Sequence, residues 1–192
     1  VTESLLFALF AIALPTIYGY IIPGIATNVM KKWRFRGKML LGDYYIHHGF
    51  KYASNINLSF FLAFGDAYLK PTPSTHQYLT IALCAAFIQG FLIWIHDTHC
   101  IKLGMLEIDN IFSRKHRSAE EISFQYAPLT FFLIGLTFAI STLYAYQALV
   151  VEGRETWQVF GYCLVSGFVL MATAPSIAFH LLEKRWAKLE NA

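Results

Sequence analysis

The chain alternates long uncharged stretches with short polar ones. The uncharged stretches, without Asp, Glu, Lys or Arg, are residues 5–29, 78–95, 126–151 and 157–182. A helix rises about 1.5 Å per residue, and roughly 17–25 apolar residues are enough to cross a bilayer. The pattern therefore predicts transmembrane helices over residues 4–30, 78–99, 126–150 and 157–182.

A fifth stretch, residues 40–69, is partly apolar but carries several ionisable side chains. Polar residues recur in it at intervals of four, which places them on one face of a helix: Asp43, His47, Lys51 and Asn55. Ionisable groups at membrane depth are costly, so this stripe is expected to face a protein interior or water. The alternative is an amphipathic segment that lies along the membrane surface, with only residues 53–68 crossing.

The basic residues favour a crossing by this fifth stretch. If residues 40–69 span the membrane, the lysines and arginines of the connecting segments lie on one face, except Lys70 and Arg154. An excess of basic residues marks the cytoplasmic side of a membrane protein. We therefore predict an all-α integral membrane protein whose single domain is a bundle of five transmembrane helices. With five crossings the N-terminus is expected outside and the C-terminus in the cytoplasm, and the bundle has four helices if residues 40–70 do not span.

Composition supports a membrane location. The 192 residues are 56% hydrophobic and only 14% charged, whereas an average soluble domain has about 25% charged residues. The net charge of +3 comes from short basic patches between apolar stretches, which is not the pattern of a nucleic-acid-binding protein. We expect a protein integral to the plasma membrane, in bacteria the inner membrane, surrounded by lipid and associated with further copies or other membrane subunits.

Histidines gather at the expected cytoplasmic ends of the helices: His47, His96, His99 and His180. Neutral imidazole is the commonest protein ligand of metals, and two imidazoles on facing helices can ligate haem. These residues are therefore candidates for a transition-metal or haem site. The sequence lacks HExxH and CxxC spacings, so an interfacial role without any ligand is the other interpretation.

Two local patterns predict finer features. Ser118 and Glu121 have the spacing of a capping box, so a helix is expected to begin near Ser118. Small residues in the last apolar stretch predict a close contact between helices. They are Gly161, Gly167, Ala172, Ala174, Pro175 and Ala178.

Three functions are compatible with the sequence, which has no nucleophile, phosphate-loop or dinucleotide motif and so favours a non-enzymatic role. The first is a small polytopic protein that acts as an oligomeric channel or transporter, or as a subunit of a larger membrane complex, with the polar stripe facing the interior. The second is a membrane-embedded redox, metal or haem enzyme that uses the histidines. The third is a membrane anchor or sensor whose cytosolic partner docks on Arg114, Lys115 and Arg117.

Overall fold

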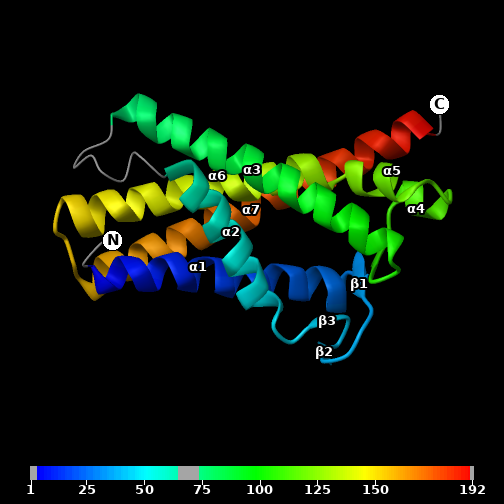
Figure 1. Ribbon diagram of the computed structural model, residues 1–192, viewed down its shortest axis with the longest axis horizontal. Helices are drawn as coiled ribbons and strands as arrows, with labels where there is room; N and C mark the ends of the chain where they lie inside the picture. The colour runs from blue at the N-terminus through cyan, green and yellow to red at the C-terminus, as the bar shows by residue number, and fades with distance from the viewer. Residues whose placement is uncertain (1–3, 65–73, 191–192) are drawn as a thin grey trace.

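The computed structural model describes residues 4–64 and 74–190, and it is all-α, with 78% of these residues helical (Figure 1). The long helices are α1 (Leu5–Gly24), α2 (His48–Phe64), α3 (Thr75–Lys102), α6 (Ala127–Tyr146) and α7 (Trp157–Glu190). A π-helical turn extends α1 as η1 (Ile25–Val29) and another extends α6 as η3 (Gln147–Val151). The short elements are β1 (Trp33–Phe35), β2 (Leu40–Leu41), β3 (Tyr44–Tyr45), β4 (Leu106–Ile108), α4 (Ile111–Arg114) and α5 (Ala119–Phe124).

Within the described residues, four helical segments are long and apolar enough to cross a bilayer. They are Leu5–Val29, Thr75–Lys102, Ala119–Val151 and Trp157–Leu189. These segments correspond to the four uncharged stretches of the sequence, so the prediction of an all-α membrane protein is confirmed at this level.

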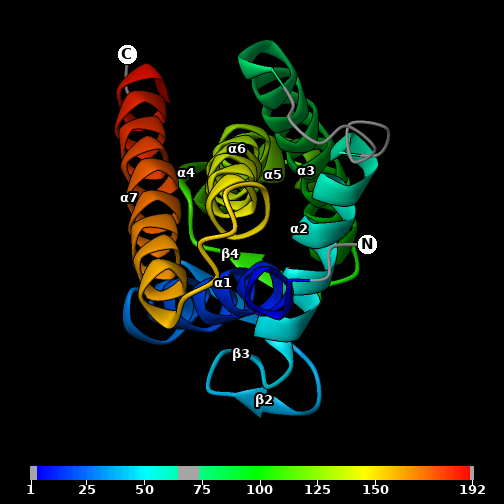
Figure 2. The same ribbon diagram turned by 90° about the vertical axis from the view of Figure 1, so that its left-hand side faces the viewer.

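Helix α6 lies at the centre of the bundle, with α1, α2, α3 and α7 around it (Figure 2). In the most apolar part of the α6 segment 61% of the residues are buried, whereas in that of the α7 segment only 22% are buried. Phe138 and Ala139 of α6 are completely inaccessible to solvent. The outer faces of the surrounding helices are apolar and exposed, as expected where lipid replaces water.

Glycines allow close approaches between helices, and one of these approaches joins α3 and α6. A Cβ atom at Gly135 would lie 3.0 Å from Ala86 Cα and 2.8 Å from Gln89 Cβ. A Cβ atom at Gly90 would lie 2.9 Å from the carbonyl oxygen of Pro128. Small residues let helix backbones approach closely, so α3 and α6 pack tightly along their contact.

Helix α2 runs antiparallel to α1 and reaches the far end of the bundle. The Asn57 side chain donates a hydrogen bond to the Ala11 carbonyl oxygen at 2.9 Å. At the end of α2, the Phe64 ring lies 5.7 Å from the Tyr146 ring, which also contacts Phe7 in the first turn of α1. The 17 residues of α2 are roughly 25 Å long, and α2 is not one of the four apolar segments given above.

The predicted second helix begins later than residue 40. Residues 40–47 form β2, a turn and β3, and helix α2 begins at His48. The physical reason is backbone geometry: Met39 and Gly42 have φ of 61° and 67°, which is left-handed and incompatible with a helix. Asn28 secures the turn by accepting a hydrogen bond from the Asp43 amide at 2.7 Å. The predicted end of this helix, residues 65–69, lies outside the described residues.

The strands, α4 and α5 cap one end of the bundle, where α7 also ends, and the N-terminus and the turn between α6 and α7 lie at the other end (Figure 1). We call the capped end the basic end. Strands β1 and β4 pair antiparallel, with Arg34 opposite Glu107. Ion pairs tie the cap together, at 2.8 Å between Lys31 and Asp43 and at 2.8 Å between Arg114 and Asp109.

Acid is expected to loosen this cap. Hydrogen bonds from Arg114 lower the pKa of Asp109, and a hydrogen bond from Lys31 lowers the pKa of Asp43. A carboxyl group whose pKa is lower in the folded state stabilises it above the unfolded pKa, about 3.9, and loses that effect as pH falls through the folded pKa. Hydrogen-exchange protection of residues 31–46 and 103–117 should therefore fall between about pH 5 and about pH 3, more than that of the long helices. The variant Asp109→Asn should show reduced protection of residues 103–117 already at neutral pH, and equal protection would contradict the assignment.

Candidate functional site

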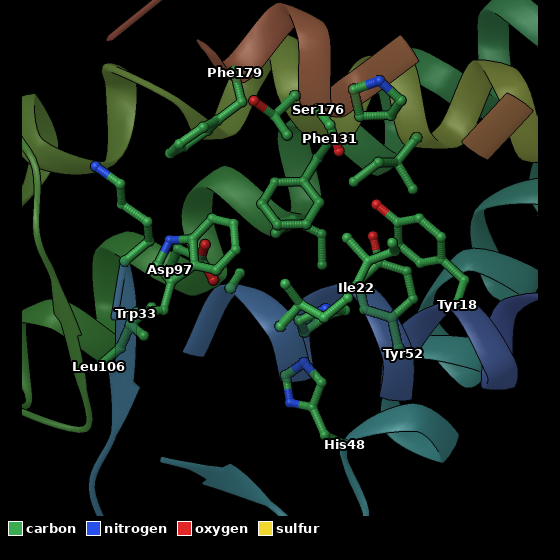
Figure 3. A pocket seen from close by; sticks show the side chains of 18 of the residues that line it. Tyr18, Ile22, Trp33, His48, Tyr52, Asp97, Leu106, Phe131, Ser176 and Phe179 are labelled. Carbon is green, nitrogen blue, oxygen red and sulfur yellow. The ribbon is translucent and has the colours of Figure 1, made fainter. Parts of the chain in front are cut away.

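A cavity of about 250 Å³ lies among the helices at the basic end. Figure 3 shows Trp33 and Asp97 on one side of it, Tyr18 and Tyr52 on the other, and Phe131 between them. Side chains from α1, α2, α3, α6 and α7 all contribute to its wall, together with β1 and β4. The cavity is therefore formed by the assembled bundle and not by any single helix.

The wall is mainly aromatic. The Trp33 ring lies 5.5 Å from the Phe179 ring, and the Tyr18 ring lies 5.5 Å from the Tyr52 ring. Phe131 of α6 contacts Tyr52 at a ring distance of 6.5 Å. Flat, rigid side chains of this kind present a large apolar surface to a bound molecule and lose little conformational entropy.

Two buried hydroxyl groups in this wall make no close hydrogen bond within the described residues, although one of them has the Tyr18 hydroxyl as a neighbour. They are Tyr52 Oη and Thr130 Oγ1, from residues that are only 8% and 5% exposed. A buried polar group without a partner costs about 1–3 kcal/mol, and such groups are rare in folded proteins. A polar atom of a molecule held in the cavity would supply the missing partner.

A chain of polar contacts runs from the cavity into the protein. The Lys51 Nζ atom lies 3.0 Å from His96 Nε2, and His96 Nδ1 lies 3.1 Å from Asp97 Oδ1. The hydroxyl of Tyr126 donates to Asp97 Oδ2 at 2.6 Å. Lysine can only donate and an aspartate can only accept, so the neutral ring carries its proton on Nδ1 and accepts from Lys51 through Nε2.

A separate ion pair joins the cap to α7 at the edge of the cavity. Lys32 Nζ lies 2.8 Å from Glu183 Oε1, and both residues contribute to the wall. These two charges neutralise each other. Lys51, in contrast, has no carboxylate within 4.0 Å among the described residues, and its polar neighbour is His96 Nε2.

The predicted polar stripe is divided by the late start of α2. Lys51 and Asn55 lie on the helix and contribute to the cavity wall. Asp43 and His47 precede the helix, so the prediction that they continue the stripe is wrong. Asp43 pairs with Lys31, and His47 is exposed and stacked on the Tyr45 ring at 5.4 Å.

The four candidate histidines do not form one cluster. His96 and His180 contribute to the cavity wall, whereas His47 and His99 are exposed. Within the described residues, no group of three or more His, Cys, Asp or Glu side chains is arranged to hold a metal ion. A shared metal site of His47, His96, His99 and His180 is therefore not assembled, and ligation of haem by two of them stays a prediction.

The proposed partner-binding arginines are engaged within the chain. Arg114 makes two hydrogen bonds to Asp109, at 2.8 and 2.9 Å, and Arg117 lies 3.7 Å from Glu121. Lys115 follows directly at the exposed end of α4. These arginines stabilise the cap itself, and docking of a cytosolic partner on them stays a prediction.

Sequence reasoning missed the two hydroxyl groups of the cavity. Tyr52 and Thr130 belong to apolar stretches in which Tyr and Thr are common, so neither carries a recognisable spacing. Only the packing of α2 against α6 shows that both contribute to the same wall.

No known protein family, curated protein or solved structure matches the chain significantly, so its function has to be argued from the cavity and its surroundings.

Proposed function

We propose that the chain is an integral membrane protein that crosses the plasma membrane five times and binds a small, mainly apolar molecule in the cavity at its basic end. It would act as a carrier, or as the ligand-binding subunit of a membrane assembly. The basic end faces the cytoplasm in this proposal, and the N-terminus lies outside.

The observation that carries the proposal is an aromatic cavity whose wall holds two buried hydroxyl groups without a close hydrogen bond. Binding sites for small molecules are concave and mainly apolar, with a few polar groups that fix orientation. Tyr52 and Thr130 supply such groups from two different helices. Both hydroxyl groups are costly in the empty protein, and a bound polar atom would remove that cost.

The packing in the other half of the bundle favours a carrier over an open pore. Beyond the cavity, buried apolar side chains pack together between the helices: Phe10, Leu14, Ile56, Phe60, Phe138 and Leu149. Interiors packed in this way leave no room for a continuous column of water. A molecule in the cavity is thus accessible from the basic end, and release on the other side would require the helices to move.

Two features support five crossings with the basic end inside. Helix α2 is roughly 25 Å long and packs beside α1, α3 and α6, where its Asn57 and Ser59 side chains bond Ala11 of α1 and Gln89 of α3. The basic residues then concentrate at one end, as cytoplasmic segments do. They are Lys31, Lys32, Arg34, Arg36, Lys38, Lys102, Arg114, Lys115, Arg117, Lys184, Arg185 and Lys188.

Removing the two hydroxyl groups tests the proposal. In the double variant Tyr52→Phe with Thr130→Val, the ligand-free protein should be more stable by about 1 kcal/mol or more, because unpartnered polar atoms disappear. The same variant should lose the bound molecule. The matched control is Thr142→Val, which removes another buried and unpartnered hydroxyl of α6 that does not contribute to the cavity.

Native mass spectrometry of protein extracted gently from membranes is the measurement. We expect the wild-type chain and the Thr142→Val control to retain a small molecule, and the double variant to lose it. Retention of that molecule by the double variant at the level of the control, or its absence from the wild-type chain, would contradict the proposal.

A further inference from the structure

The charges around the cavity are unequally satisfied. Glu183 is paired with Lys32, and both oxygens of Asp97 already accept hydrogen bonds, from His96 and Tyr126. The remaining charge is that of Lys51, an exposed residue at the edge of the cavity, whose ammonium group donates one hydrogen bond to His96 Nε2. Its other two N–H groups have no acceptor among the described residues.

A cation in this position suits an anionic group of a ligand. Hydrogen bonds between an ammonium group and a carboxylate or phosphate are about twice as strong as neutral ones. His96 and Asp97 orient Lys51 from behind, since the imidazole accepts from Nζ while its other nitrogen donates to the carboxylate. The ammonium group is thereby held beside the cavity and is less free to extend into the headgroup region, as an unrestrained lysine would.

The rest of the cavity suits an apolar body. Trp33, Phe131 and Phe179 supply aromatic surface, and the volume of about 250 Å³ is slightly below the range of roughly 300–1,000 Å³ for drug-sized ligands. A single hydrocarbon chain or a small ring system fits this volume better than a two-chain lipid. The hydroxyl groups of Tyr52 and Thr130 would then meet an uncharged oxygen of the ligand.

We infer that the ligand is a single-chain amphiphile with one anionic group, a carboxylate or a phosphate ester, which binds Lys51 while its apolar part lies against Trp33, Phe131 and Phe179. This inference rests on the proposed function and adds the chemical class of the ligand. A cationic ligand is disfavoured, because both carboxylates of the cavity are already paired. An anion without an apolar body would leave the aromatic wall uncovered.

Tryptophan quenching by brominated amphiphiles tests the inference at the site itself. The full chain is placed in nanodiscs of phosphatidylcholine, with Phe at three of the four tryptophan positions. One variant keeps Trp33 in the cavity wall, and its control keeps Trp157, which is 68% exposed at the opposite end of the bundle. The probes are ω-bromodecanoate, ω-bromodecyl phosphate and the neutral ω-bromodecanol. Quenching of Trp157 reports simple partition into the bilayer, and inorganic phosphate is added as a competitor without an apolar chain.

Both anionic probes should quench Trp33 saturably and bind at least about tenfold more tightly than the alcohol, equivalent to about 1.4 kcal/mol. Lys51→Gln should bring the three affinities within about twofold of one another, and Lys51→Arg should keep the preference. Lys188→Gln, an exposed lysine far along α7, should behave as the unaltered chain. Equilibrium dialysis of radiolabelled decanoate against the chain with all four tryptophans gives the same comparison if a triple replacement does not fold.

The outcomes separate the inference from the function it rests on. If the alcohol binds as tightly as the anions, or Lys51→Gln keeps the preference, the anionic class is overturned while the cavity remains a binding site. Displacement of decanoate by inorganic phosphate would show that a free anion occupies the site, which also overturns the inference. If no probe quenches Trp33 saturably and decanoate does not bind in dialysis, the proposed function fails as well.

Discussion

Replacing Gly135 by leucine is expected to lower the free energy of unfolding by about 3 kcal/mol or more. Its first added atom would lie 3.0 Å from Ala86 Cα and 3.2 Å from the Ala85 carbonyl oxygen. Those are backbone atoms of α3 and cannot turn aside as a side chain can, so the two helices would have to separate. Because α6 lies at the centre of the bundle, the loss should extend to the contacts that α6 makes with α1, α2 and α7.

Thermal unfolding in detergent, followed by size-exclusion chromatography, measures this effect. The matched control is Gly161→Leu in α7, since a Cβ atom at Gly161 would have no other atom within 4 Å. We expect the control to unfold close to the temperature of the unaltered chain. Equal losses for the two variants, or no loss for Gly135→Leu, would show that the α3–α6 contact is looser than the structure has it.

Removing the Asp97 carboxylate is the second large effect. Asp97→Ala should cost about 3–5 kcal/mol, because it leaves the buried Tyr126 hydroxyl and the His96 ring without their acceptor. Tyr126→Phe removes one hydrogen bond to a charged group and should cost only about 1.5–3 kcal/mol. The double variant should lose less stability than the sum of the two single losses, because the hydrogen bond between the two residues can be lost only once.

An exposed acid at the same end serves as control. Glu120 pairs with Lys102, and both side chains are about half exposed. Glu120→Ala is expected to change stability by no more than about 1 kcal/mol. Denaturant unfolding of the four variants and the unaltered chain in one detergent gives the comparison. A loss of stability for Glu120→Ala as large as that for Asp97→Ala would refute the special role of the buried carboxylate.

The four helical segments that are apolar enough to cross a bilayer could be predicted, because each contains a long stretch of sequence without charged residues. The capping box of Ser118 and Glu121 could also be predicted, and the structure confirms it as the start of α5. The start of α2 could not be predicted correctly. The polar residues already recur at intervals of four from residue 43, but the backbone at Gly42 is left-handed and the helix begins only after it. A spacing of polar side chains carries no information on backbone handedness.

The close helix contact was only partly predicted. Of the small residues in α7, Gly167 does approach a neighbour, with its added Cβ 3.0 Å from Leu14, but Gly161 faces open space. Closer approaches are made at Gly90 and Gly135, between α3 and α6, and at Gly19 and Gly49, between α1 and α2. Small residues permit contact on any helix, and only the positions of the partners decide which of them is used.

Four residues that the sequence singled out lie in the cavity wall, whereas two hydroxyl groups of the same wall were not singled out. Lys51, Asn55, His96 and His180 contribute to the cavity, and an ionisable residue in an apolar stretch is itself a signal. Tyr52 and Thr130 gave no such signal, since their importance comes from the absence of a partner in the folded bundle. That property depends on every neighbouring helix and cannot be read from local sequence.

The most direct test of the account is the side of the membrane on which each connecting segment lies. On a background without native cysteines, single cysteines are introduced by His76→Cys, Arg154→Cys, Lys38→Cys and Lys188→Cys, all at exposed positions. With five crossings and the basic end inside, a membrane-impermeant maleimide added to intact cells should label the first two proteins and should label the last two only after lysis. If the His76→Cys and Lys38→Cys proteins are labelled from the same side, α2 does not cross, and the cavity end of the bundle is not the cytoplasmic end proposed here.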